Sequence, residues 1–293
     1  MAGPELCVIF NPAAGRRRAR RRLEQIRAEW GAHVEFQPTE HAGHAVELAE
    51  QAAREGIPVV AAAGGDGTVH EVVNGLMRAG RPDVRFALIP VGSANDFAYS
   101  LRHTADPQRI DVGRVRAPGG RERYFACNVG MGLGGAVTWE SRRIHHLQGV
   151  ALYGLATLRA LRQHFRHTWL DLQFDDDPVW RTPTLLFSVL NGKREGGFEL
   201  APRAELADGR LDFLHAGALS RWQVLCLLPR LALFGAPAEY PGVRQGRCRH
   251  VRLHSEEPLR VHTDGEFFCR PEQDVRALEV ELLPGRLRVL RRR

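Results

Sequence analysis

Residues 59–76, VVAAAGGDGTVHEVVNGL, constrain the fold more than any other stretch of the sequence. Small or branched apolar residues at 59–63 predict a short buried strand, and a helix should follow because apolar side chains recur at helical spacing at Val69, Val72, Val73 and Leu76. The turn between them contains Gly64, Gly65, Asp66, Gly67 and Thr68. Glycines let a ligand approach the backbone, and the first N–H groups of a helix attract anions. We therefore expect a nucleotide phosphate at this turn; the alternative is a tight turn without a ligand.

The same order of strand, turn and helix occurs elsewhere in the first part of the chain. Further strands are predicted at 6–10, 33–37 and 84–90. A helix is predicted after each of them: the first is the arginine-rich segment that runs to Trp30, the second is at 43–55, and the third runs through 97–101. Consecutive units of this kind form a parallel sheet covered by helices, with ligands bound outside the carboxyl ends of the strands. We therefore expect the turns that follow these strands to meet at one edge of the sheet.

The pattern changes beyond residue 120, where strands of alternating character dominate. They are predicted at 124–129, 169–174, 179–190, 211–215, 249–254, 259–262 and 275–282, with helices at 142–165 and 221–234. Hairpin signals at Asp177-Pro178 and Asp264-Gly265 favour antiparallel pairing and a β-sandwich. The predicted fold is α/β plus β: a parallel-sheet α/β nucleotide-binding domain at 1–120, ending at a linker turn at 118–120, and an antiparallel β-sandwich domain at 121–285. Residues 286–293 are expected to rejoin the first domain.

Charge and cysteine content narrow the class of protein. The chain has 293 residues, with 41 Lys and Arg against 34 Asp and Glu, so its net charge of +7 suits an anionic partner. Its five cysteines are far apart and odd in number, which is typical of thiols in a reducing compartment. The sequence shows neither a signal peptide nor the roughly 20 apolar residues of a spanning helix. We expect a cytoplasmic protein that associates peripherally with the inner face of the membrane.

The central stretch also resembles a known family. GGDGT followed by His70-Glu71 and Asn74-Gly75-Leu76 resembles the diacylglycerol kinase and sphingosine kinase catalytic superfamily, and in particular the bacterial YegS-like lipid kinases. NAD kinases share the GGDG turn. The resemblance implies that the nucleotide is bound by Gly64, Gly65, Asp66, Gly67, Thr68, Val69, His70 and Glu71.

Three other pieces resemble the family's nucleotide contacts. Asn11-Pro12-x-x-Gly15 precedes Arg16, a cation that would face phosphates, and the Thr39 hydroxyl would contact the nucleotide ahead of Gly43-His44-Ala45. PVGSANDFA at 90–98 places Ser93 where the family usually has Thr, and Asn95 follows it; the Asn-Asp-Phe continuation favours a lipid kinase over a NAD kinase. Without a ligand, the first two pieces are an ordinary Asn-Pro turn and the start of a helix.

A metal site is implied farther along. An Asp turn with free carbonyl oxygens can hold a hard cation such as Mg²⁺. The resemblance assigns this role to the carboxylate of Asp208 and to the backbone carbonyls of Glu205 and Arg210, although neither of the latter is the expected residue type. An ordinary Asp-Gly turn is the alternative.

The predicted reacting centre is Thr263-Asp264-Gly265-Glu266. Phosphoryl transfer to a hydroxyl needs an offset of the phosphate charge and a base that accepts the hydroxyl proton. Glu266 matches the family's general base. Asp66 and Asp264 are the other carboxylates of this catalytic group, and we expect them to organise Mg²⁺ or to orient their neighbours.

Together these motifs predict an ATP-dependent lipid kinase with Mg²⁺. The acceptor would be diacylglycerol, phosphatidylglycerol or a sphingoid base at a membrane surface. The helical segment at 145–161 favours core packing over a membrane anchor, and it could still line the pocket of this lipid. No nucleic acid partner is expected, because the arginines lack interleaved aromatic residues; the oligomeric state is open, with a homodimer as one outcome. Two alternatives stay open: a soluble-substrate kinase of the NAD kinase type, and a non-catalytic regulator that binds nucleotide or anionic lipid.

Overall fold

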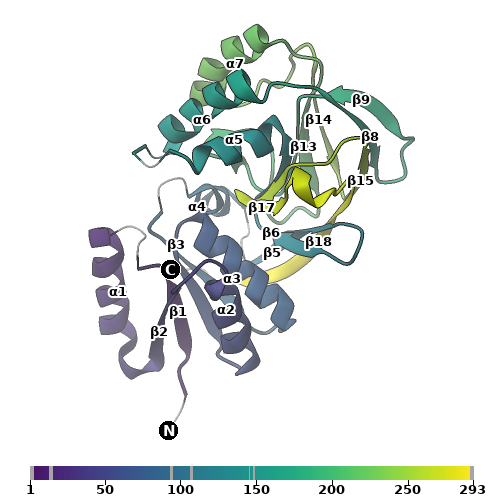
Figure 1. The fold of residues 1–293 in the computed structure, drawn as a ribbon. Coiled ribbons are helices and arrows are strands. Elements are labelled where there is room, and N and C mark those ends of the chain that lie inside the picture. Colours follow the sequence, from purple (N-terminus) through teal and green to yellow (C-terminus); the bar gives the residue numbers. More distant parts are fainter. Residues whose placement is uncertain are drawn as a thin grey trace.

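A computed structural model describes residues 3–12, 16–92, 95–105, 108–144, 146–147 and 149–290, with the side chains of 16–20 and 22 left out. One half of the molecule contains the first four strands and helices of the chain, and the other half contains β-sheet topped by three helices (Figure 1). The predicted fold class is confirmed.

The first half is a parallel sheet with strand order β2-β1-β3-β4. Its strands and helices alternate along the chain: β1 (Leu6–Phe10), α1 (Arg16–Trp30), β2 (Val34–Pro38), α2 (His44–Arg54), β3 (Val59–Gly64), α3 (Asp66–Ala79), β4 (Arg85–Pro90) and α4 (Asp96–Arg102). These bounds lie within two residues of most predicted ones. One difference matters for the site: α3 already begins at Asp66, so Asp66, Gly67 and Thr68 form its first turn and only Gly64 and Gly65 remain outside.

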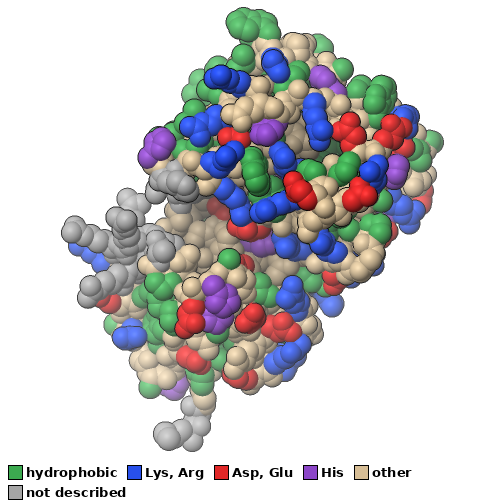
Figure 2. All heavy atoms as spheres, viewed as in Figure 1, with side chains coloured by type: hydrophobic (Ala, Val, Ile, Leu, Met, Phe, Trp, Pro, Cys, Tyr) green, Lys and Arg blue, Asp and Glu red, His purple; other side chains and the backbone are tan. Residues whose placement is uncertain are grey.

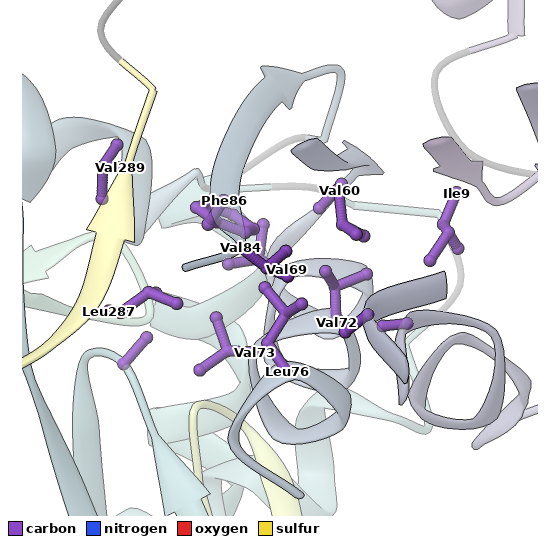
Figure 3. Packing of buried hydrophobic residues seen from close by; sticks show 14 of the residues in the cluster. Ile9, Val60, Val69, Val72, Val73, Leu76, Val84, Phe86, Leu287 and Val289 are labelled. Atoms are coloured by element: carbon purple, nitrogen blue, oxygen red, sulfur yellow. The ribbon is translucent and has the colours of Figure 1, made fainter. Parts of the chain in front are cut away.

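Apolar side chains from both layers fill the core of this half (Figure 3). Val60 and Phe86 point from the sheet toward Val69, Val72 and Val73 of α3, and each of these side chains is at least 96% buried. Burial of a valine or phenylalanine side chain stabilises a fold by about 1.5–3 kcal/mol. The regular spacing that predicted α3 therefore reflects the face that it presents to the sheet.

Strand β18 (Ala277–Val289) continues the sheet into the second half. It pairs in parallel with β4 through Arg288 and Val289, and antiparallel with β5 (Arg109–Arg116) and β15 (His250–Ser255). Strands β8 (Thr168–Phe174) and β9 (Trp180–Thr184) extend the sheet, and β6 (Glu122–Phe125) pairs with β5. The turn at 118–120, predicted to be a linker, thus joins two neighbouring strands of one sheet.

A second, antiparallel sheet packs against this extension. Its order is β14-β13-β10-β7-β16-β17, formed by Val243–Cys248, Leu211–Ala216, Leu186–Leu190, Asn128–Gly132, Val261–Thr263 and Glu266–Cys269. Phe174 of the first sheet stacks on Phe213 of the second with ring centroids 4.2 Å apart. The predicted β-sandwich is confirmed, although 179–190, predicted as one strand, is split between the two sheets as β9 and β10. A small separate sheet contains β11 (Arg194–Glu195) and β12 (Phe198–Glu199).

Three helices, α5 (Leu133–Ser141), α6 (Gly149–Gln163) and α7 (Arg221–Phe234), cover one end of this half (Figure 1). We call them the helical cap. Ser220 is the N-cap of α7, and its hydroxyl accepts a hydrogen bond from the Gln223 N–H in a capping box. Within the described residues, no helix is both long enough and apolar enough to cross a bilayer. The remaining helical turns are 3-10 segments at Gly31–His33 and Pro271–Gln273.

Candidate active site

The turns that follow the parallel strands lie against one another, as the sequence predicted. The Thr39 N–H donates to the Phe10 carbonyl over 2.8 Å, and the Val91 N–H donates to the Gly64 carbonyl over 3.1 Å. A Cβ at Gly92 would lie 2.4 Å from Gly65 Cα, and a Cβ at Gly64 would lie 2.2 Å from Thr68 Oγ1. No side chain fits at such distances, so these glycines are required for the two turns to approach each other. Gly64 is buried, whereas Gly65 and Gly92 are partly exposed.

Several residues predicted to bind the nucleotide border this edge. Asn11 follows β1, Thr39 follows β2, and Asn95 has a left-handed backbone (φ 53°) and donates its amide to the Gly92 carbonyl over 2.7 Å. Val69 is buried and lines the cavity described below. Gly15 and Ser93 lie outside the described residues, as does the side chain of Arg16, which opens α1. Gly67 faces Glu266 across the cleft.

His70 and Glu71 have structural contacts where the resemblance implied nucleotide contacts. His70 is 4% exposed, and its Nδ1 lies 2.9 Å from Asp264 Oδ2. The Glu71 carboxylate accepts hydrogen bonds from the Gly43 and Ala45 N–H groups over 2.9 and 3.1 Å, which caps the start of α2. Both residues sit in the predicted motif because they hold α3 in place, and a direct contact of the buried His70 ring with nucleotide does not fit this geometry.

Asp264 anchors the predicted reacting centre. With Gly265 it forms the hairpin turn between β16 and β17, and both residues have positive φ, at 49° and 82°. Its carboxylate accepts hydrogen bonds from the N–H groups of Ala126, Cys127 and Asn128 over 2.8–2.9 Å. Burial alone would raise the pKa of Asp264, but the hydrogen bond and charge of His70 and these N–H groups lower it overall. Of its two predicted roles, the geometry favours that of orienting its neighbours.

Asp66, which is partly buried, and Asp96, which is buried, lie beside this turn. Asp66 Oδ1 accepts a hydrogen bond from the Phe97 N–H over 3.4 Å, and Asp96 accepts one from the Gly197 N–H over 3.0 Å. Burial raises the pKa of Asp66, and burial followed by the charge of Asp66 raises the pKa of Asp96 to about 7. Two carboxylates held in this way repel each other, so a cation between them would relieve the strain on both.

Glu266, the predicted base, opens β17 at the edge of the cleft. Its Oε2 lies 2.5 Å from Arg142 Nη2, and its Oε1 would lie 3.7 Å from a Cβ at Gly67. The side chain is 41% exposed, so a substrate can reach it. The base is therefore next to the first turn of α3, with an arginine beside it that can face negative charge.

The turn predicted to bind Mg²⁺ lies elsewhere. Asp208 Oδ2 is 3.3 Å from Arg247 Nη1, its Oδ1 accepts the Arg210 N–H over 3.0 Å, and Glu205 pairs with Lys193 Nζ over 3.4 Å. No group of three His, Cys, Asp or Glu side chains suited to a metal occurs in the described part of the chain. The Asp208 carboxylate, the one side-chain ligand of the predicted set, therefore already faces a protein cation. The Mg²⁺ site at this turn stays a prediction, and we assign no step to it.

A cavity of about 150 Å³ opens at Asp66, Asp96 and Asp264 and continues under the helical cap. Its far end is apolar and is lined by Leu133, Val137, Leu186, Val224, Leu228 and Leu231. Between the two ends lie His262 and Glu195, whose Nε2 and Oε1 are 3.1 Å apart. The cavity therefore offers carboxylates at one end and a hydrocarbon lining at the other.

The sequence did not single out Asp96, Glu195, His262 or Arg142 as site residues. Asp96 is part of the motif at 90–98, so its carboxyl group could have been recognised there as a candidate. Glu195 and His262 are on separate short strands, and Arg142 follows α5; their proximity to the site comes from the strand order, which no local pattern reports.

Comparison with known proteins agrees with this geometry. Residues 5–115 match the family model described as the diacylglycerol kinase catalytic domain, and residues 127–291, more than half of the chain, match the YegS C-terminal NAD kinase beta sandwich-like domain. The chain belongs to the YegS-like diacylglycerol kinase family. This confirms the predicted family and the enzyme class, a phosphotransferase that uses an alcohol group as acceptor.

Individual members of the family show the extent of the likeness. The diacylglycerol kinase of Bacillus subtilis (strain 168) is 28% identical over 279 residues, covering 89% of each chain. A crystal structure of a diacylglycerol kinase from Bacillus anthracis str. Sterne superposes with a TM-score of 0.69 over 98% of this chain and 96% of that one, at 19% identity. An NAD kinase from Archaeoglobus fulgidus, solved in complex with ATP, superposes with a TM-score of 0.50 at 12% identity. The superposition covers 98% of this chain and 93% of that one. The two structural likenesses show a shared fold.

Proposed function

We propose that this protein is an ATP-dependent lipid kinase that transfers the γ-phosphate of ATP to the hydroxyl of a lipid such as diacylglycerol. The observation that supports this most directly is the cavity, because its carboxyl groups meet the glycine turns at one end and its apolar end lies under the helical cap. A polar reacting end joined to an apolar interior suits an acceptor that has both a hydroxyl and hydrocarbon chains.

In this proposal the nucleotide binds where the turns converge. The backbone of Gly64 and Gly65 and the first N–H groups of α3 would face the phosphates, since helix N-termini favour negative charge. Asn11, Thr39 and Asn95 border the same edge and would contact the remainder of the nucleotide. Arg142, next to Glu266, supplies positive charge near the phosphate that is transferred.

Magnesium would accompany ATP as part of the substrate. Protein kinases and ATPases usually hold Mg²⁺ through one or two carboxylates together with the substrate phosphates, and Asp66 and Asp96 form such a pair. Their raised pKa values fit this role, because a cation would stabilise the charged forms that burial disfavours. The ion would offset the charge of the phosphates during transfer.

On the acceptor side, Glu266 would take the hydroxyl proton as the oxygen attacks the γ-phosphorus and ADP leaves. Asp264 would keep the hairpin that carries Glu266 in register through its bonds to 126–128. Asn128 Oδ1 and Glu195 Oε2 are buried and have no hydrogen-bond partner among the described residues. Both residues line the cavity, so these oxygens could accept hydrogen bonds from a second polar group of the lipid.

The test is transfer of phosphate from γ-labelled ATP to a panel of hydroxyl lipids in mixed micelles, comparing wild type with Glu266→Gln. A general base contributes roughly 10²–10⁴-fold to the rate, so we expect a labelled lipid whose formation falls by that factor in the variant. Glu257→Gln is the matched control, because Glu257 is also part of an exposed arginine pair, at 3.3 Å from Arg166. That control should keep the wild-type rate.

Two results would contradict the proposal. Phosphorylation of NAD but of no lipid would establish the soluble-substrate alternative. ATP binding without transfer to any acceptor would favour a regulator. If Glu266→Gln kept the full rate of lipid phosphorylation, the reaction class would stand and the base would have to be another group.

A further inference from the structure

Helix α7 has an apolar face that nothing in the described structure covers. Trp222, Cys226, Pro229 and Leu233 follow one another at helical spacing, and all four are exposed. Trp222, Leu233 and Phe234 are 74%, 74% and 76% exposed, and no residue of the helix is buried. Since the opposite side, with Val224, Leu228 and Leu231, lines the cavity, α7 is apolar on both sides.

The neighbouring helix extends this surface. Helix α6 contacts α7 and exposes Val150 and Leu158, at 44% and 47%. Five of the seven large apolar side chains that are strongly exposed in the described structure are therefore on these two helices; the other two are Trp169 and Val179. Concentration of exposed apolar side chains on one element is typical of an interaction surface.

The same two helices are strongly basic. Residues 149–163 and 221–234 contain Arg159, Arg162, Arg221 and Arg230 but no Asp or Glu. None of these four arginines pairs with a carboxylate within the described part of the chain. Figure 2 shows hydrophobic and basic side chains together at the top of the molecule, where α7 lies in Figure 1. We name this the cap surface: Val150, Leu158, Trp222, Leu233 and Phe234 with the four arginines.

We propose that the cap surface docks the protein onto an anionic lipid bilayer, a role that builds on the proposed lipid kinase activity. Arginines attract the anionic head groups, while exposed Trp, Phe and Leu side chains insert at the boundary between head groups and acyl chains. The inner side of α7 lines the substrate cavity. A lipid could therefore pass from the bilayer into the cavity around this helix with little exposure of its chains to water.

Charge favours a bilayer over a second copy of the chain. In a symmetric dimer the same patch occurs on both subunits, so the four arginines would face four arginines without a carboxylate between them. An anionic bilayer supplies the complementary charge instead. Such attraction between exposed charges weakens with salt, which makes ionic strength a direct probe.

The test uses flotation to measure how much protein binds to sonicated vesicles. One set of vesicles contains phosphatidylcholine with 30 mol% phosphatidylglycerol, and the other contains phosphatidylcholine alone. Each set is measured at about 0.1 and 0.5 M salt. The variant replaces Trp222, Leu233 and Phe234 by Glu. The matched control is Val179→Glu, because Val179 is 62% exposed and lies on the β8–β9 turn, outside the helical cap. Circular dichroism and thermal unfolding of both variants should equal those of wild type, since none of these side chains is buried.

We expect wild type and Val179→Glu to bind anionic vesicles, with weaker binding at high salt, and the triple variant to bind at least tenfold more weakly. Phosphorylation of long-chain diacylglycerol in the vesicles should fall by the same factor. Phosphorylation of dioctanoylglycerol below its critical micelle concentration should stay unchanged, because this reaction needs no docking.

Other outcomes overturn the proposal. Equal vesicle binding by the triple variant would show that the cap surface is not the docking site. If the triple variant lost the same share of activity on vesicles and on the monomeric lipid, these residues would belong to the cavity instead. If light scattering showed a dimer for wild type but not for the variant, and wild type did not bind vesicles, the residues would belong to a subunit interface. If wild type phosphorylates no lipid, the proposed function fails while the flotation result still decides the docking surface.

Discussion

Helices α3 and α7 have the same length of 14 residues and both line the cavity, yet they are built in opposite ways. Eight residues of α3 are buried, whereas none of α7 is. The side chains of α3 also make direct polar contacts with the second half: His70 reaches Asp264, and Asn74 bonds both to the N–H and to the carbonyl of Tyr124. Helix α7 meets the rest of the protein mainly through partly buried leucines and valine.

Under the proposed function, this difference separates two tasks of one cavity. Phosphoryl transfer depends on groups held within fractions of an ångström, and α3 is fixed well enough to provide that precision for Asp66 and the adjoining turn. A wall that admits lipid needs an apolar lining and tolerance of movement, and elements with few buried contacts are the ones that open most readily. Substitutions should therefore affect stability strongly at the α3 wall and weakly at the α7 wall.

The largest effect is expected for Asp264→Asn. The change leaves an amide among three N–H donors and removes the charge that faces His70, which should lower the free energy of unfolding by roughly 3 kcal/mol. Because the folded-state pKa of Asp264 is lowered, its ionised form stabilises the protein above the ordinary pKa of 3.8, and this stability is lost as pH falls through the folded value. Urea unfolding of wild type and variant from pH 7 to pH 3 measures both the loss of stability and its pH dependence. Equal free energies of unfolding at pH 7 would contradict this prediction.

Gly75→Ala on α3 comes next. A Cβ at Gly75 would lie 2.3 Å from the Val46 carbonyl oxygen, so α2 and α3 would have to separate, at a cost of about 1–3 kcal/mol. Cys226→Ser on α7 is the paired change, because Cys226 is exposed, and its effect should stay within about 0.5 kcal/mol. Thermal unfolding of the two variants compares the walls directly. Similar shifts in Tm would refute the distinction drawn between them.

Asp96→Asn should have a smaller effect of the opposite sign. The folded-state pKa of Asp96 is raised to about 7, so between about pH 4 and 7 the native state binds one proton more than the unfolded state, and stability falls as pH rises through this window. The variant should remove this slope and gain on the order of 1–2 kcal/mol at pH 8, while losing Mg²⁺-dependent transfer. Unfolding at pH 5 and pH 8 tests the slope. If Asp96→Asn were less stable than wild type at pH 8, the ionised carboxylate of Asp96 would not destabilise the folded protein.

The fold could be predicted from sequence where local pattern determines it. Alternating strands, glycine turns and amphipathic helices located β1 to β4 and their helices closely, and α7 was predicted with its observed bounds. The second half was predicted less well because its sheets depend on distant pairing. The polar β14 and the short β17 were missed, and the split of 179–190 between two sheets follows from strand order and has no local signal.

The site shows the same division. The glycine turn, Asp264 and Glu266 are in motifs, and the structure places them around one cleft. The contacts of His70 and Glu71 could not be predicted, because their partners lie 194 and 28 residues away in the chain. The metal site at the Asp208 turn was predicted from the family resemblance. Arg247, the cation that pairs with Asp208, is on a strand that the sequence did not reveal.

Strand β18 has a consequence for how the protein is made. Its end, at Arg288 and Val289, completes the sheet beside β4, and Leu287 and Val289 are buried in the core of the first half (Figure 3). During synthesis this flank of β4 therefore has no partner until about 200 further residues have left the ribosome. Such long-range closure slows folding and leaves β4 open to pairing with other chains. Chaperone dependence in the cell should thus centre on the flank of β4.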